Sequence, residues 1–78
     1  MNATEAIIAA NNRYEHAEAN RLLREHGRLI GTSPSRVRYW LVGDDVLCSL
    51  SYTQIHFAGR REGEPRWIAP SSFEEVAP

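Results

Sequence analysis

The sequence predicts an α+β fold in which a helical first half is followed by a small antiparallel β-sheet or hairpin. Apolar residues recur at helical spacing from Thr4 to Ile30, whereas Asp45–Phe57 alternates apolar and polar residues as a half-buried strand does. The length of 78 residues and the hydrophobic content of 42% suit one folded domain with a small core. We therefore expect a single domain over residues 1–78, with residues 70–78 as an irregular tail.

The first half is expected to form one long helix from about Thr4 to Ile30, or two helices joined near Asn11–Asn12 or Asn20. Asn2 or Thr4 can cap the first turn, because their side-chain oxygens can accept a hydrogen bond from a free amide there. The apolar residues form two neighbouring stripes, which consist of Ile7, Ala10, Tyr14 and Ala17, and of Ala19, Leu22, Leu23, His26, Leu29 and Ile30.

The segment Gly27–Leu41 is compatible with two structures, and the first is a helix that begins after Ser33. A serine oxygen can cap the free amides of a helix, and Pro34 at the first helical position loses no hydrogen bond. Gly43 would then end the helix. The apolar face of this helix would consist of Val37, Trp40 and Leu41, at positions i, i+3 and i+4.

Gly27 and Gly31 extend this pattern to a helix-turn-helix, which needs a small residue where the helices meet and a glycine where the chain reverses. The stretch Gly31–Leu41 resembles the turn and recognition helix of helix-turn-helix DNA-binding proteins of the phage Cro/repressor and excisionase types. The resemblance implies a small non-enzymatic transcriptional regulator of phage or mobile-element type, which binds duplex DNA as a dimer and carries a C-terminal β-hairpin. The residues implied to contact DNA are Arg24, Arg28, Ser33, Ser35, Arg36, Arg38 and Tyr39.

The second structure for this segment is a strand, because Arg36–Val42 is rich in β-branched and aromatic residues and alternates up to Tyr39. Gly43–Asp45 would then form a hairpin turn. The corresponding function is a small protein-binding inhibitor or adaptor, with a long helix packed on a three-stranded antiparallel sheet. Surface arginines, or the aromatic side chains of Trp40 and Tyr39, would contact the partner. In size, acidity and lack of catalytic residues the chain resembles anti-CRISPR proteins of phages. Periodicity alone does not separate the two structures.

The second half of the chain is expected to contain antiparallel strands from about residue 45 to 69. The alternation in Asp45–Phe57 changes parity near Thr53, which predicts a bulge or bend there. Gly59–Gly63 is expected to be a polar turn. Glu64–Ala69 is expected to return as a short edge strand, since it contains a proline.

The charge distribution is uneven along the chain. All nine basic residues are arginines, and the net charge is −1. Between Arg21 and Arg38 there are five arginines against the single acid Glu25, whereas the chain from Asp44 onward is acidic on balance. A basic middle suits a protein that contacts phosphate through one face, and it equally suits a solvated helix surface.

No residue pattern predicts catalysis, a metal site or a cofactor. His16, His26 and His56 lack metal-ligand spacing, and the lone Cys48 alternates with apolar neighbours, so we expect this thiol to be buried and unreactive. The sequence has neither a glycine-rich phosphate loop nor a nucleophile elbow, and we expect no enzyme activity. Because it also lacks a long apolar run, a signal peptide and paired cysteines, we expect a cytoplasmic protein without a membrane partner.

Overall fold

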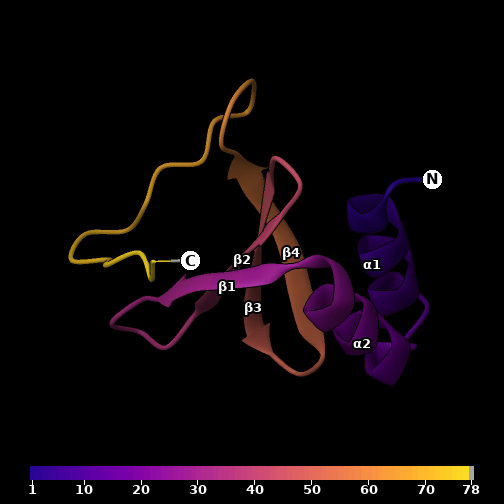
Figure 1. The fold of residues 1–78 in the computed structure, drawn as a ribbon. Helices are drawn as coiled ribbons and strands as arrows, with labels where there is room; N and C mark the ends of the chain where they lie inside the picture. The colour runs from indigo at the N-terminus through magenta and orange to yellow at the C-terminus, as the bar shows by residue number, and fades with distance from the viewer. Residues whose placement is uncertain (78) are drawn as a thin grey trace.

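The computed structural model describes residues 1–77 and contains two helices followed by a four-stranded antiparallel sheet (Figure 1). The strands neighbour one another in chain order, so each is joined to the next as a hairpin. The elements are α1 (Ala3–Asn12), α2 (His16–His26), β1 (Arg28–Thr32), β2 (Arg38–Val42), β3 (Asp45–Ser51) and β4 (Gln54–Arg60). This order confirms the predicted α+β fold with a helical half followed by a small sheet.

The helical half consists of two helices rather than one long helix. The Asn2 side chain accepts a hydrogen bond from the Glu5 N–H (2.8 Å), and the Glu5 side chain accepts one from the Asn2 N–H (3.3 Å). This reciprocal capping box fixes the beginning of α1. The helix ends at Asn12, so of the alternatives left open by the sequence the one with two helices joined near Asn11–Asn12 is correct.

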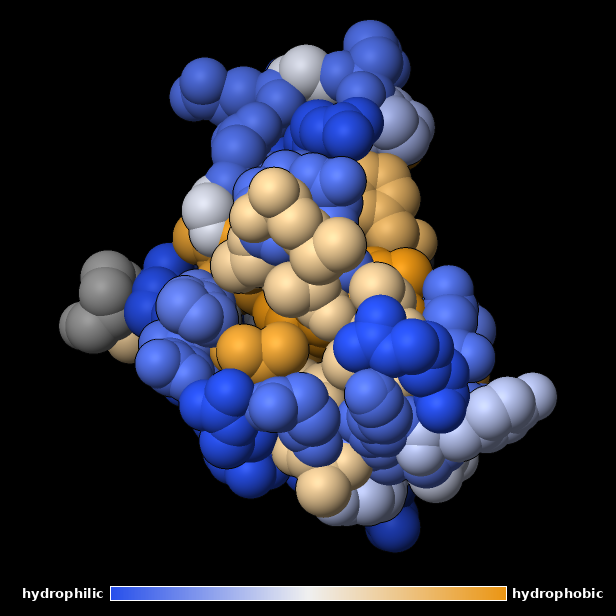
Figure 2. Space-filling model, turned by 90° about the vertical axis from the view of Figure 1, so that its right-hand side faces the viewer, coloured by the Kyte–Doolittle hydropathy of each residue, from blue (hydrophilic) through white to orange (hydrophobic). Residues whose placement is uncertain are grey.

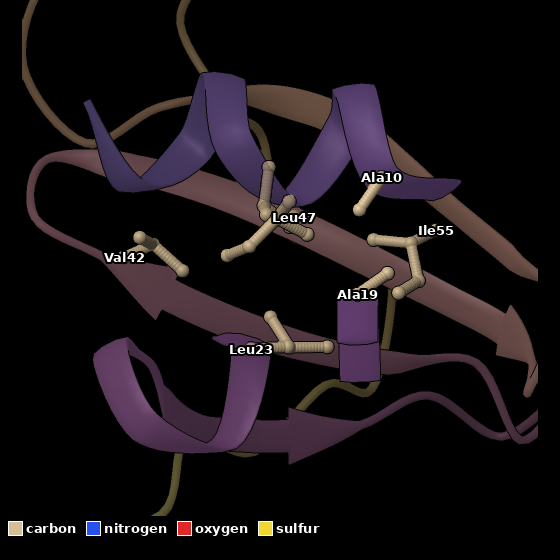
Figure 3. Packing of buried hydrophobic residues seen from close by; sticks show 7 residues of the cluster. Ala10, Ala19, Leu23, Val42, Leu47 and Ile55 are labelled. Carbon is tan, nitrogen blue, oxygen red and sulfur yellow. The ribbon is translucent and has the colours of Figure 1, made fainter. Parts of the chain in front are cut away.

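The hydrophobic core lies between the two helices and one face of the sheet (Figure 3). Both helices and three of the strands contribute side chains that point into this layer, as the close-up shows. The seven core residues are Ile7, Ala10, Ala19, Leu23, Val42, Leu47 and Ile55, each at most 4% exposed. Their burial supplies most of the hydrophobic stabilisation of this layer.

The chain that follows β4 packs on part of the opposite face of the sheet (Figure 1). Tyr39 of β2 packs against Trp67 and Phe73 of this tail, and all three pairs of ring centroids are 5.5 Å apart. Glycines in the sheet allow the close approach: a Cβ at Gly31 would lie 2.7 Å from Phe73 Cε1, and one at Gly59 would lie 2.8 Å from Trp67 Cα. The tail therefore covers the part of this face that surrounds Tyr39.

The prediction of a helix over Ser33–Val42 is wrong, because Arg38–Val42 is strand β2 and the residues before it form a hairpin loop. In this loop the Arg36 N–H donates to the Ser33 carbonyl (2.8 Å), and the Val37 N–H donates to the Ser33 hydroxyl (3.2 Å). The dihedral angle that proline fixes suits the second position of a turn as well as the first position of a helix. Arg36 has φ +69°, so the backbone leaves the right-handed region and no helix continues. The strand alternative is the correct one for Arg38–Val42, whereas Arg36 and Val37 belong to the loop before it.

The sheet also begins earlier than predicted and ends earlier. β1 lies at Arg28–Thr32, before the predicted strand region, and the Asp45–Phe57 region is divided into β3 and β4 by a turn at Tyr52–Thr53. The predicted strand at Glu64–Ala69 is replaced by a single bridge between Arg60 and Arg66. Gly43, with φ +62°, lies in the turn between β2 and β3, as the extended alternative predicted.

Candidate functional site

An open hollow of about 370 Å³ lies on the helix-bearing face of the sheet, between α2, strands β1 to β3 and the turn after β3. We call it the arginine hollow. It is lined by two arginines, two aromatic residues, two leucines and two small polar residues: Arg24, Arg38, Trp40, Tyr52, Leu23, Leu29, Asn20 and Ser49.

The register of the sheet brings the strand residues of the arginine hollow together. Arg38 and Trp40 share a face of β2 with the core residue Val42, because side chains alternate along a strand. Arg38 is paired with Ser49 of β3, and Trp40 is paired with Leu29 of β1. The wall opposite these strands is α2, whose Leu23 is anchored in the core.

Arg24, the neighbour of Leu23 in α2, gives the hollow its second positive charge. Arg24 and Arg38 are both exposed, and neither pairs with a carboxylate of residues 1–77. Four other arginines do have such partners: Arg13, Arg21, Arg60 and Arg61. Because no lining residue is acidic, the hollow carries two positive charges without a counter-charge.

The inner wall of the arginine hollow is held by hydrogen bonds. The Asn20 side chain donates to the carbonyls of His16 (2.8 Å) and Tyr52 (2.7 Å), which ties α2 to the turn between β3 and β4. Ser49 Oγ donates to the Ser51 carbonyl (3.3 Å). These bonds fix the position of the polar lining before any ligand arrives.

Trp40 differs from these residues because its indole N–H is unused. Within residues 1–77, Trp40 Nε1 is the one buried side-chain nitrogen or oxygen that has no hydrogen-bond partner. Buried polar groups in folded proteins are nearly always paired, so this unpaired donor is unusual. The nitrogen itself is shielded from solvent, and Trp40 lines the hollow through its other atoms.

Of the seven residues predicted to contact DNA, only Arg24 and Arg38 line the arginine hollow. Tyr39 lies on the opposite face of β2, among the aromatic residues of the tail. Burial raises the pKa of its hydroxyl. Trp40 was predicted only as a protein contact, and Tyr52 had no predicted role. Arg38 and Trp40 are two positions apart in β2, and residues two apart in a strand point to the same face. This spacing is the sequence signal that could have placed them on one surface.

The other four predicted residues lie outside the hollow. Ser33 and Ser35 lie in the loop between β1 and β2, where their hydroxyls are 2.9 Å apart and bond to each other. Arg36 is exposed in the same loop. The Arg28 guanidinium donates to the Val76 carbonyl (3.4 Å) at the tail. These residues therefore form no single surface with Arg24 and Arg38.

A second open groove, of about 530 Å³, lies between α1 and β4. Its apolar residues include Met1, Ile8 and Phe57, and Figure 2, which views the helix side, shows apolar side chains in the middle of this side and hydrophilic ones around them. Arg60 in this groove is paired with Asp45 (3.3 Å). The arginine of this groove is therefore paired with a carboxylate, unlike the two arginines of the arginine hollow.

Cys48 is half-buried rather than buried, which corrects the prediction, and burial raises the pKa of its thiol. Within residues 1–77 no group of three histidine, cysteine or acidic side chains could hold a metal ion. In the same residues, neither helix has the length and apolar character that crossing a bilayer requires.

Comparison with known proteins gives no relative: no family model matches the chain, and no significant match is found among curated proteins or solved structures. The chemistry of the arginine hollow therefore carries the functional conclusion.

Proposed function

We propose that the protein is a small, non-enzymatic protein-binding module, an inhibitor or adaptor that contacts its partner through the arginine hollow. The observation that carries this proposal is the gathering of Trp40, Tyr52, Arg24 and Arg38 around one open hollow. Tryptophan, tyrosine and arginine are the residue types most enriched in the energetic centres of protein interfaces. A hollow lined by them suits a protruding side chain of a partner protein.

Two further features favour a protein partner over duplex DNA. The helix over Ser33–Val42, which motivated the DNA-binding hypothesis, is replaced by a loop and by β2. The net charge of −1 provides no long-range attraction for a polyanion. A cytoplasmic location, where the single Cys48 thiol stays reduced, is consistent with this proposal.

Site-specific photocrosslinking tests the proposal. The crosslinker p-benzoylphenylalanine replaces Tyr52, which lines the hollow and is 55% exposed, or Tyr14, which is 84% exposed and does not line it. After irradiation in the source cells, we expect protein adducts from the Tyr52 position and not from the Tyr14 position. Adducts with DNA, no adducts, or the same adducts from both positions would contradict the proposal.

A further inference from the structure

The arginine hollow has the charge and the hydrogen-bond donors of an anion site. Arg24 and Arg38 have no carboxylate partner within residues 1–77, whereas Arg60 of the neighbouring groove has Asp45. A guanidinium presents its N–H donors in a planar fork that fits the two oxygens of a carboxylate. The chain thus neutralises the arginine of one groove internally and leaves those of the other available to an external anion.

We propose, on the basis of the protein-binding function proposed above, that the arginine hollow binds a carboxylate of the partner. This carboxylate belongs to a glutamate or aspartate in an acidic segment. The carboxylate lies between the guanidinium groups of Arg24 and Arg38. Trp40 also lines the hollow, but its indole nitrogen is shielded from solvent, so the two guanidinium groups are the donors available to the carboxylate.

The apolar part of the lining favours an acidic side chain over the phosphates of a duplex. Leu23, Leu29 and Trp40 line the hollow beside the arginines. They can contact the methylene groups of an acidic side chain, and apolar contact of this kind gains hydrophobic free energy. Duplex phosphates have no such apolar part, and their binding depends on many basic residues acting together. Two arginines in a concave site fit one carboxylate better than a row of phosphates.

NMR spectroscopy of the full ¹⁵N-labelled chain tests this inference, because the two tryptophans report on opposite faces of the sheet. Trp40 lines the hollow, and Trp67 packs against Tyr39 on the other face. The probes are an acetylated peptide with a Glu-Leu-Glu centre, its Gln-Leu-Gln counterpart and a short duplex DNA. We expect the glutamate peptide to shift the Trp40 indole N–H resonance and to leave that of Trp67 unchanged, and we expect the glutamine peptide to shift neither.

Matched arginine variants identify the donors. Arg24→Gln and Arg38→Gln, singly and together, remove the guanidinium groups of the hollow, whereas Arg66→Gln removes an exposed arginine of the tail that also has no carboxylate partner within residues 1–77. Each hollow variant is expected to weaken binding of the glutamate peptide about tenfold, as loss of a charge-assisted hydrogen bond does. Arg66→Gln is expected to leave it unchanged. The single variants keep the test decisive if the double variant fails to fold.

Four results would overturn the inference: no shift of Trp40 with the glutamate peptide, equal shifts with both peptides, unchanged binding in the hollow variants, or a Trp40 shift with DNA alone. Protein adducts at Tyr52 without binding of the glutamate peptide would reject the carboxylate site and leave the protein-binding function supported. Absence of those adducts together with glutamate-peptide binding would reject the function and leave the anion site.

Discussion

Arg38 and Tyr39 are neighbours in β2, and their side chains lie on opposite faces of the sheet. Arg38 lines the arginine hollow on the helix side, whereas the Tyr39 ring packs 5.5 Å from the rings of Trp67 and Phe73 on the tail side. Because alternate residues of a strand serve different faces, one short strand contributes both to the proposed binding surface and to the packing of the tail. Substitutions at these two positions should therefore have separable effects.

The double variant Arg24→Gln/Arg38→Gln should keep the stability of the native chain. Both side chains are exposed and lack carboxylate partners within residues 1–77, so their removal breaks no ion pair described there. We expect the free energy of unfolding to change by less than about 0.5 kcal/mol, as is usual for such surface positions. Urea denaturation followed by circular dichroism measures it. A loss of several kcal/mol would show that these arginines have a structural role.

Asn20→Ala should destabilise the fold, in contrast to the arginine variants. The Asn20 side chain is 8% exposed and donates to the carbonyls of His16 and Tyr52. The substitution removes both hydrogen bonds of a buried side chain, including the one that ties α2 to the turn after β3, and we expect a loss of about 1–3 kcal/mol in the free energy of unfolding. Asn12→Ala, at an exposed position at the end of α1, is the control and should have a much smaller effect. Equal losses in the two variants would contradict the role of Asn20.

Gly31→Ala should displace the tail, because its Cβ would lie 2.7 Å from Phe73 Cε1 and 2.9 Å from the Glu74 carbonyl oxygen. We expect a loss of more than about 1 kcal/mol in the free energy of unfolding. In a Phe73→Ala background much of this additional loss should disappear, since the ring that the new methyl group meets is gone. A double-mutant cycle measures the coupling between the two positions. Additive losses would contradict the packing of Phe73 on Gly31.

The half-buried Cys48 thiol should make stability depend on pH above neutrality. Burial raises its pKa in the folded protein, whereas the unfolded thiol ionises near its ordinary pKa of about 8.5. The stabilising contribution of the neutral thiol is therefore fully present below about pH 8.5 and is lost as the pH rises through the higher folded pKa. Relative to Cys48→Ala, the native chain should lose stability as the pH rises above about 8.5. Parallel pH curves for the two proteins would refute this.

The helical part of the fold was predictable because its signals are local. Asn2 and Glu5 have the spacing of a capping box, and the asparagine pair at Asn11–Asn12 indicated where α1 ends. β1 was missed because Leu29 and Ile30 continue the helical spacing of the preceding apolar residues. Their strand conformation depends on pairing with β2, which is a tertiary interaction.

The segment around β2 could not be decided from sequence because its local signals are ambiguous. Ser33 and Pro34 begin a turn here, and the same two residues would begin a helix equally well. The tail was also only partly predictable: Arg66 forms a single bridge with Arg60, and Trp67 contacts the sheet by aromatic packing rather than as part of a strand. In this chain, contacts distant in sequence determine the second half of the fold.

The candidate site was predictable only in part for the same reason. Arg24 and Arg38 stood out as members of a local arginine excess, but no local pattern indicates that they share a hollow. That arrangement requires the extended form of β2, which places Arg38 and Trp40 on one face, and the packing of α2 on that face. The role of Tyr52 depends on the turn after β3, which had been predicted as a bulge or bend in a continuous strand.

The central claim is tested most directly by an affinity measurement. The partner protein that crosslinks to p-benzoylphenylalanine at position 52 is purified, and its affinity for variants of the chain is measured. Isothermal titration calorimetry compares the native chain, Arg24→Gln/Arg38→Gln and the tail control Arg66→Gln. Loss of two charge-assisted hydrogen bonds should raise the Kd about a hundredfold or more in the double variant and leave it unchanged in the control. Equal affinities for all three proteins would contradict binding through the arginine hollow.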